Sequence, residues 1–203
     1  MGEKTKNYYN DVPEEYVKDY EIDAKDIKFT IIFGLILNLV LAIGTIAICF
    51  SIKKIGFGDF FGASKTANIK ISGIFIFIAS MFAYIIMHEL THGLFYKIFT
   101  HEKLTYGFTL TVAYCGCPKL YIKKWPMFIT SLAPFVVYSI LFIVPLFFIN
   151  DIAIYAAVSF LLGIHIGGCI GDLYCATIML FKYHKKDIII NDTGPKQTFY
   201  IKK

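Results

Sequence analysis

Charged side chains are scarce in this sequence. They make up 17% of its 203 residues, against 57% hydrophobic residues, and the mean hydropathy is +0.61. Arginine is absent, so all 20 basic residues are lysine. A chain without guanidinium groups cannot make the bidentate contacts that hold phosphates and base edges. Because the chain has few charges and is largely apolar, we expect an integral membrane protein surrounded by the lipid bilayer. Because it has no arginine, we expect no nucleic-acid partner, despite a net charge of +5.

The distribution of cysteine does not indicate disulfides. The five cysteines are an odd number, and most of them lie in or beside apolar segments. A secreted disulfide framework is therefore not expected. The first 28 residues are polar and contain eight of the 15 acidic residues. Such a beginning lacks the basic and apolar regions of a cleavable signal peptide.

Long stretches with little charge indicate the fold class. A transmembrane helix needs ~20 consecutive, mostly apolar residues to cross a hydrocarbon layer of ~30 Å. Four stretches meet this requirement: 29–52, 71 to about 99, 126–149 and 152 to about 181. The sequence therefore predicts an all-α integral membrane bundle of about four transmembrane helices. Because only Asn150 and Asp151 separate the last two stretches, these should form a tight antiparallel hairpin.

The distribution of lysine predicts the orientation. With four spans, both ends of the chain and the segment from about 100 to 125 lie on one side, and together with Lys97 they contain 16 of the 20 lysines. Lysine is enriched on the cytoplasmic side of membrane proteins. We therefore expect a multi-pass protein of the cell membrane with both termini in the cytoplasm. The predicted parts are a cytoplasmic N-terminal segment (1–28), a transmembrane domain (29–182) and a cytoplasmic tail (183–203).

The segment between the second and third stretches has a different composition. Its sequence, THEKLTYGFTLTVAYCGCPKLYIKKW, is rich in Thr, Tyr, Val and Phe with partial alternation, and glycine and proline interrupt it. This pattern predicts one or two short β-strands, which could form a membrane-associated hairpin. An ordinary interfacial loop with aromatic residues is the alternative.

A polar cluster interrupts the second stretch: His88, Glu89 and His92 in the order H-E-L-T-H. On a helix, the spacing of four places both imidazoles on one face, where they can bind one Zn²⁺. The glutamate between them can act as a general base on water that the metal makes acidic. A charged side chain at the centre of a membrane helix costs at least ~2.5 kcal/mol. We therefore interpret the cluster as catalytic or metal-binding rather than as a chance occurrence of the motif.

A third protein ligand is needed, because catalytic zinc sites usually have three together with a water. Apart from Glu89, Asp172 is the only acidic residue well inside a predicted span. At ~1.5 Å per residue, His88 and Asp172 lie at similar depths near the cytoplasmic side. The sequence therefore nominates Asp172 as the third ligand. Alternatively, Asp172 caps a helix end or pairs with Lys182.

Three further features lie in or after the fourth stretch. His165, two turns before Asp172, is a candidate catalytic residue that could hydrogen-bond a substrate carbonyl, stabilise an oxyanion or orient water. It could equally be a satisfied polar residue packed between helices. Glycines recur at 163, 167 and 171 and would let another helix approach closely. The triplet at 192–194, Asp-Thr-Gly, occurs in aspartic proteases, but these need two facing aspartates, so no catalytic role is assigned to it.

Several segments together resemble a known family. They are HELTHGLF in the second stretch, SLAPF at 131–135, GDLY at 171–174 and, outside the apolar stretches, VPEEY, EIDAKDIKF and DTG. The chain resembles the putative zincin peptidases, small bacterial membrane proteins catalogued as a domain of unknown function. More distantly, it is similar to site-2 proteases, intramembrane zinc metalloproteases that use HExxH on one span and an aspartate on a later one. Where typical site-2 proteases have Asn-Pro-Asp-Gly, this chain has IGDL.

The resemblance implies a metalloprotease-like domain at 29–182 in a bacterial plasma membrane. It implies Zn²⁺ as cofactor, with His88, His92 and Asp172 as ligands and Glu89 as general base. The leading hypothesis is a zinc metalloprotease that hydrolyses peptide bonds of membrane or juxtamembrane substrates. The alternative is a non-catalytic membrane protein that binds metal or interacts with other proteins. A proton-relay transporter is a third hypothesis, less favoured because a relay does not require the HExxH spacing. The sequence does not indicate an oligomeric state.

Overall fold

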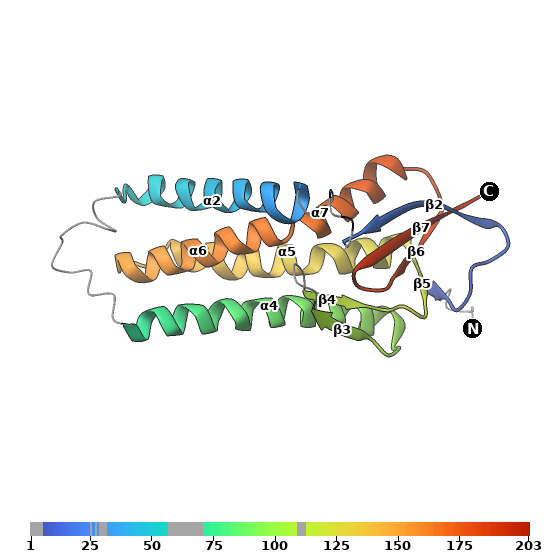
Figure 1. The fold of residues 1–203 in the computed structure, drawn as a ribbon, viewed down its shortest axis with the longest axis horizontal. Coiled ribbons are helices and arrows are strands. Elements are labelled where there is room, and N and C mark those ends of the chain that lie inside the picture. Colours follow the sequence, from blue (N-terminus) through green and yellow to red (C-terminus); the bar gives the residue numbers. More distant parts are fainter. Residues whose placement is uncertain (1–5, 25, 27, 29–31, 57–70, 109–112) are drawn as a thin grey trace.

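The computed structural model describes residues 6–24, 26, 28, 32–56, 71–108 and 113–203 (Figure 1). Four helical segments in this part of the chain are long and apolar enough to cross a membrane. They comprise η1 (Ile32–Leu37) with α2 (Asn38–Lys53), then α4 (Ile71–Thr100), α5 (Lys124–Leu146), and α6 (Ile152–Gly168) with α7 (Ile170–Thr177) and η2 (Ile178–Lys182). Both η segments are π-helical. The predicted four-helix bundle is thus confirmed for the described residues; the expected start of the first span, 29–31, lies outside them.

The outer sides of these helices are apolar. Ile43 on α2, Phe75 on α4 and Phe147 at the end of α5 are 64%, 68% and 78% exposed. Contiguous apolar surface of this kind is rare on soluble monomers but carries no penalty in hydrocarbon. A helix also satisfies its own backbone hydrogen bonds, which a bilayer requires. The apolar outer surface and the satisfied backbone of the bundle are therefore compatible with a lipid bilayer.

Close backbone contacts hold α2 against α6. A Cβ added at Gly163 would lie 2.9 Å from the Ala42 carbonyl oxygen, and one at Gly167 would lie 2.6 Å from that of Asn38. Side chains larger than hydrogen do not fit at these positions without a shift, so glycine permits the contact. Two of the three glycines in the predicted stripe therefore pack against the first span. The helices α5 and α6 lie side by side as the expected hairpin (Figure 1).

A two-stranded antiparallel sheet, β3 (Thr105–Phe108) with β4 (Ala113–Gly116), lies beside α4. It confirms the prediction of short strands between the second and third spans. The strands fit closely against the helix because Gly93 of α4 has no side chain: a Cβ there would lie 1.9 Å from the Tyr106 hydroxyl oxygen. This contact places the hairpin directly next to the H-E-L-T-H segment.

A second sheet covers the same end of the bundle (Figure 1). Its five strands run in the spatial order β1 (Tyr8–Tyr9), β5 (Tyr121–Lys123), β6 (Ile188–Asp192), β7 (Lys196–Lys202) and β2 (Tyr16–Asp23), with antiparallel pairing throughout. Side chains from this sheet and from the ends of α4, α5 and η2 form one core. Its fully buried members include Tyr96, Met127, Met179, Tyr183, Ile188, Ile190 and Phe199.

This sheet corrects the all-α prediction. We expected the segments 1–28 and 183–203 to be short separate tails, but β2 of the first pairs with β7 of the second along its length. Sequence analysis did not identify these strands because β1 and β5 have only two and three residues, and because the acidic and basic residues of β2 interrupt its hydrophobic pattern. Pairing also joins positions more than 170 residues apart, which local periodicity does not show.

Candidate metal centre

Helix α4 places two imidazoles on one face. His88 and His92 are one turn apart, with ring centroids separated by 5.0 Å, and each residue is only 8% exposed. Tyr84 and Tyr96 extend the same stripe by one turn in each direction. An otherwise apolar helix thus carries a continuous line of polar side chains toward the interior of the bundle.

Asp172 reaches both histidines from another span. It lies in the first turn of α7, beyond the interruption between α6 and α7 at Cys169. One carboxylate oxygen, Oδ2, is 3.2 Å from His88 Nε2, and the other, Oδ1, is 3.4 Å from His92 Nε2. The potential ligand atoms of the three residues lie within 4.8 Å of one another. The structure therefore brings together the three side chains that the sequence nominates as ligands.

A backbone carbonyl orients His92. Nδ1 of His92 lies 2.9 Å from the carbonyl oxygen of Thr130 on α5. In a regular helix, that oxygen would accept the N–H of residue 134, but residue 134 is proline and has none. Because a carbonyl only accepts hydrogen bonds, Nδ1 carries a proton, so a neutral His92 presents the lone pair of Nε2 toward Asp172.

Glu89 faces a cavity of about 170 Å³ together with the His–Asp cluster. The cavity lies between the helices and both sheets. Its lining includes His88, Glu89, His92, Tyr96, Tyr114, Cys115, Asp172, Asp192, Gly194 and Gln197. A substrate group in this space would therefore contact the cluster and Glu89 at the same time.

Asp192, the first residue of the Asp-Thr-Gly triplet, also lines this cavity. Its carboxylate accepts hydrogen bonds from the Tyr96 hydroxyl, from the Gly194 backbone N–H at 2.8 Å and from the Gln197 amide at 3.3 Å. Burial raises the pKa of this carboxyl to about 6. Burial likewise raises the pKa of the Cys115 thiol to about 12, so this thiol is neutral near pH 7. Through its hydrogen bonds to Tyr96 and Gly194, Asp192 links the end of α4 to the β6–β7 turn.

A protein-family model described as "Putative zincin peptidase" matches residues 81–187, more than half of the chain. The chain belongs to this family. The match extends from within α4 to beyond η2, so it contains the H-E-L-T-H segment and Asp172. No curated protein and no solved structure matches the chain.

Membership of a zincin peptidase family implies zinc, and the residues fit this ion. Two imidazole nitrogens and a carboxylate oxygen are a common protein donor set for catalytic zinc. The His92 Nε2 lone pair and Asp172 Oδ1 are both acceptors, yet they lie 3.4 Å apart in a buried site. Two facing acceptors repel unless a cation or a proton lies between them. The geometry around His92 thus fits a bound cation, and it fits a protonated imidazole that donates to Asp172 equally well.

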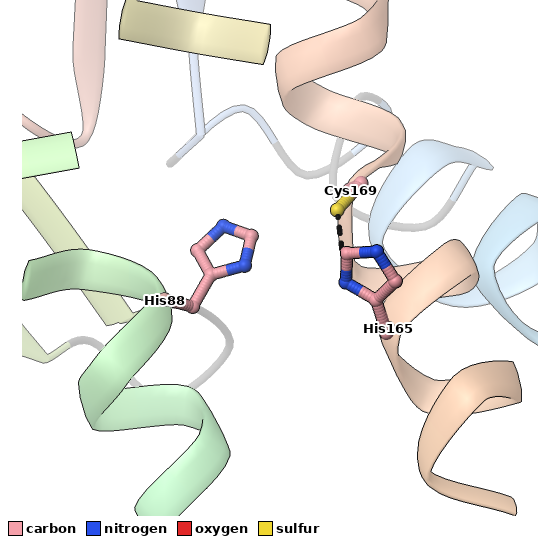
Figure 2. A group of neighbouring side chains, drawn as sticks. All are labelled: His88, His165 and Cys169. Carbon is pink, nitrogen blue, oxygen red and sulfur yellow. Dashed lines mark hydrogen bonds between the residues drawn. The ribbon is translucent and has the colours of Figure 1, made fainter. Parts of the chain in front are cut away.

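His165 lies outside the cavity lining. It is fully buried on α6, across from His88, and Cys169 lies beside it (Figure 2). The Tyr84 hydroxyl hydrogen-bonds to both histidines, at 3.1 Å from His88 Nδ1 and 2.9 Å from His165 Nδ1. Of the two interpretations of His165, this placement favours a packed polar residue over direct contact with a substrate.

Sequence reasoning did not identify Tyr84, Thr130 and Pro134 as parts of the site. Tyr84 had a detectable signal, since it precedes His88 by one helical turn on the same face. Pro134 had one too, because a proline inside a membrane helix frees the carbonyl four residues earlier. Thr130 contributes only its backbone, which no side-chain pattern can show.

Proposed function

We propose that this protein is a membrane-embedded zinc metallopeptidase that hydrolyses peptide bonds of membrane or juxtamembrane substrates. One observation carries the proposal: His88, His92 and Asp172 converge beside a cavity that Glu89 also lines. The cluster lies on apolar helices, where ionisable groups are costly and are usually kept for function. Membership of the zincin peptidase family supports the same chemistry.

The proposed ligands are Nε2 of His88, Nε2 of His92 and the Asp172 carboxylate. Zinc, when bound, supplies a Lewis acid that polarises a carbonyl and makes water acidic near neutral pH. Glu89 takes a proton from the attacking water while the water oxygen bonds to the carbonyl carbon. When the C–N bond breaks, Glu89 returns this proton to the leaving amine nitrogen. One water is consumed for each peptide bond, and Glu89 ends in its starting state.

The position of β4 supports an extended substrate. Ala113, Tyr114 and Cys115 of β4 line the cavity, and among the described residues β3 and β4 pair only with each other. A strand edge can accept an additional strand through the backbone groups that remain available; at Cys115 the backbone already hydrogen-bonds to Glu89. A substrate helix has its carbonyls in hydrogen bonds and would have to unwind locally before attack. We propose that such an unwound segment pairs with this two-stranded sheet.

The proposal is tested with Glu89→Gln, which removes the base and keeps the side-chain size. We expect purified protein in detergent to contain about one zinc per chain in both wild type and variant. Cleavage of a library of quenched fluorescent peptides should fall by about 10²- to 10⁴-fold in the variant. Metal analysis and fluorescence measure the two quantities independently.

Glu102→Gln is the matched control, because Glu102 is exposed and does not line the cavity. It should cleave at the wild-type rate. Equal cleavage by wild type and Glu89→Gln would contradict the catalytic role of Glu89. A zinc-loaded wild type that cleaves no peptide would instead favour the alternative of a non-catalytic metal-binding protein.

A further inference from the structure

A chain of hydrogen bonds extends from His88 into the centre of the bundle, away from the cavity. Tyr84 Oη lies 3.1 Å from His88 Nδ1 and 2.9 Å from His165 Nδ1. On its other side, His165 Nε2 lies 3.2 Å from the Phe135 carbonyl oxygen and 3.1 Å from Ser139 Oγ, both on α5. Tyr84 is 8% exposed and His165 is fully buried. The chain thus links α4, α6 and α5 in the interior of the bundle.

The carbonyl acceptor at the far end is compatible with one direction of donation along the whole chain. The Phe135 carbonyl only accepts, so His165 Nε2 carries a proton and His165 Nδ1 has a lone pair. The Tyr84 hydroxyl donates to that lone pair, and its oxygen is then free to accept the Nδ1–H of His88. With its proton on Nδ1, a neutral His88 presents a lone pair on Nε2, the atom that faces Asp172.

We propose that Tyr84 and His165 are positioning residues that hold His88 in the tautomer and orientation needed to bind the metal. The inference rests on the proposed function, because it takes His88 Nε2 as a zinc ligand. His92 achieves the same state in one step, since its Nδ1 donates directly to the Thr130 carbonyl. His88 needs two intermediate side chains to reach a carbonyl on the same helix, α5. A ligand imidazole usually requires such a partner on its second nitrogen.

A second metal ion between the two histidines is the competing explanation. Nitrogens of His88 and His165 and the sulfur of Cys169 lie within 4.8 Å of one another (Figure 2). However, the Tyr84 hydroxyl makes hydrogen bonds to both imidazoles, and Cys169 Sγ hydrogen-bonds to His165 Nδ1 at 3.5 Å (Figure 2). Each of these nitrogens is therefore already satisfied, one as donor and the other as acceptor. The hydrogen-bond chain accounts for the cluster without a second ion.

Tyr84→Phe is the central test, because it removes one oxygen atom from the chain. Zinc affinity is measured by competition with a chelator, using the purified protein in detergent. Loss of such a supporting hydrogen bond is expected to weaken zinc binding by about 10- to 100-fold. Tyr138→Phe is the matched control: its ring packs against Tyr84 with centroids 5.4 Å apart, but its hydroxyl bonds to Thr91. This control should bind zinc like the wild type.

His165 variants separate positioning from general packing. His165→Ala should weaken zinc binding by the same factor as Tyr84→Phe, and the double variant by no more than either, because both break one chain. Multiplied losses would indicate independent packing effects and overturn the proposal. His165→Asn keeps an oxygen near the position of Nδ1, so it should restore most of the affinity lost in His165→Ala.

The outcomes distinguish this inference from the proposed function. A wild type that binds no zinc contradicts the metal site itself. A wild type that binds zinc no more tightly than Tyr84→Phe contradicts the positioning role alone. Two zinc ions per wild-type chain, reduced to one by Cys169→Ser, would overturn the hydrogen-bond chain in favour of a second metal site.

Discussion

At the scale of single residues, Asp192 shows how burial can outweigh hydrogen bonding. The carboxylate accepts hydrogen bonds from Tyr96, Gly194 and Gln197, and these favour its charged form. The residue is nevertheless only 3% exposed, and desolvation raises its pKa to about 6. Near pH 7, Asp192 therefore keeps its charge at a cost in folding free energy.

This cost predicts a pH dependence of stability. In the unfolded chain the Asp192 pKa is near its usual value of ~3.9, so between about pH 4 and about pH 6 the folded protein binds more protons than the unfolded one. The contribution of Asp192 to the free energy of unfolding is thus fully present below about pH 4. It falls as the pH rises through about 6, and the loss is about 3 kcal/mol at most. Asp192→Asn should lack this loss. Thermal unfolding of both proteins in detergent from pH 4 to 7 tests it, and parallel profiles would contradict the prediction.

At the scale of elements, α5 supplies the backbone acceptors for both proposed histidine ligands. Thr130 accepts from His92 directly, and Phe135 accepts from His165 at the end of the chain behind His88. The Thr130 carbonyl is free for this role because Pro134 offers no N–H. The same proline that weakens the helix locally therefore provides the acceptor that orients His92.

Pro134→Ala tests this role of the helix. The new N–H competes with His92 for the Thr130 carbonyl, so we expect zinc affinity to fall by about 10-fold. The helix regains a hydrogen bond, so the unfolding temperature should stay the same or rise. Pro145→Ala is the matched control, because Pro145 lies in the last turn of α5, away from the site. Equal losses of affinity in both variants would contradict the prediction.

Elements differ in how far the sequence predicts them. The spans are visible because each is one continuous apolar stretch, and Asp172 stands out because a carboxylate is rare inside such a stretch. The β3–β4 hairpin is visible because its strands are neighbours in sequence. The five-stranded sheet is not visible, because β5 has only three residues and because β7 pairs with β2 from the other end of the chain. Tyr84 was missed because tyrosine in a membrane helix is not unusual by itself.

At the scale of the whole molecule, the bundle and the terminal sheet share the cavity. Glu89 and Asp172 come from the helices, whereas Asp192, Gly194 and Gln197 come from β6, β7 and the turn between them. Strand pairing between β2 and β7 also joins the two ends of the chain. The termini lie together at the end of the bundle that contains the site (Figure 1). An arrangement with the termini on opposite sides of a membrane would break this sheet.

We predict that both termini lie on one side of the membrane, because β2 pairs with β7, and the lysine distribution predicts the cytoplasmic side. In a bacterial host, green fluorescent protein fused to either terminus should fluoresce, and alkaline phosphatase fused to the C-terminus should be inactive. Phosphatase inserted after Ile55, at the opposite end of α2, should be active and serves as the control. An active phosphatase at the C-terminus together with a fluorescent N-terminal fusion would contradict the pairing of β2 with β7. The fully inverted pattern would keep the sheet but move the site to the outer side of the membrane.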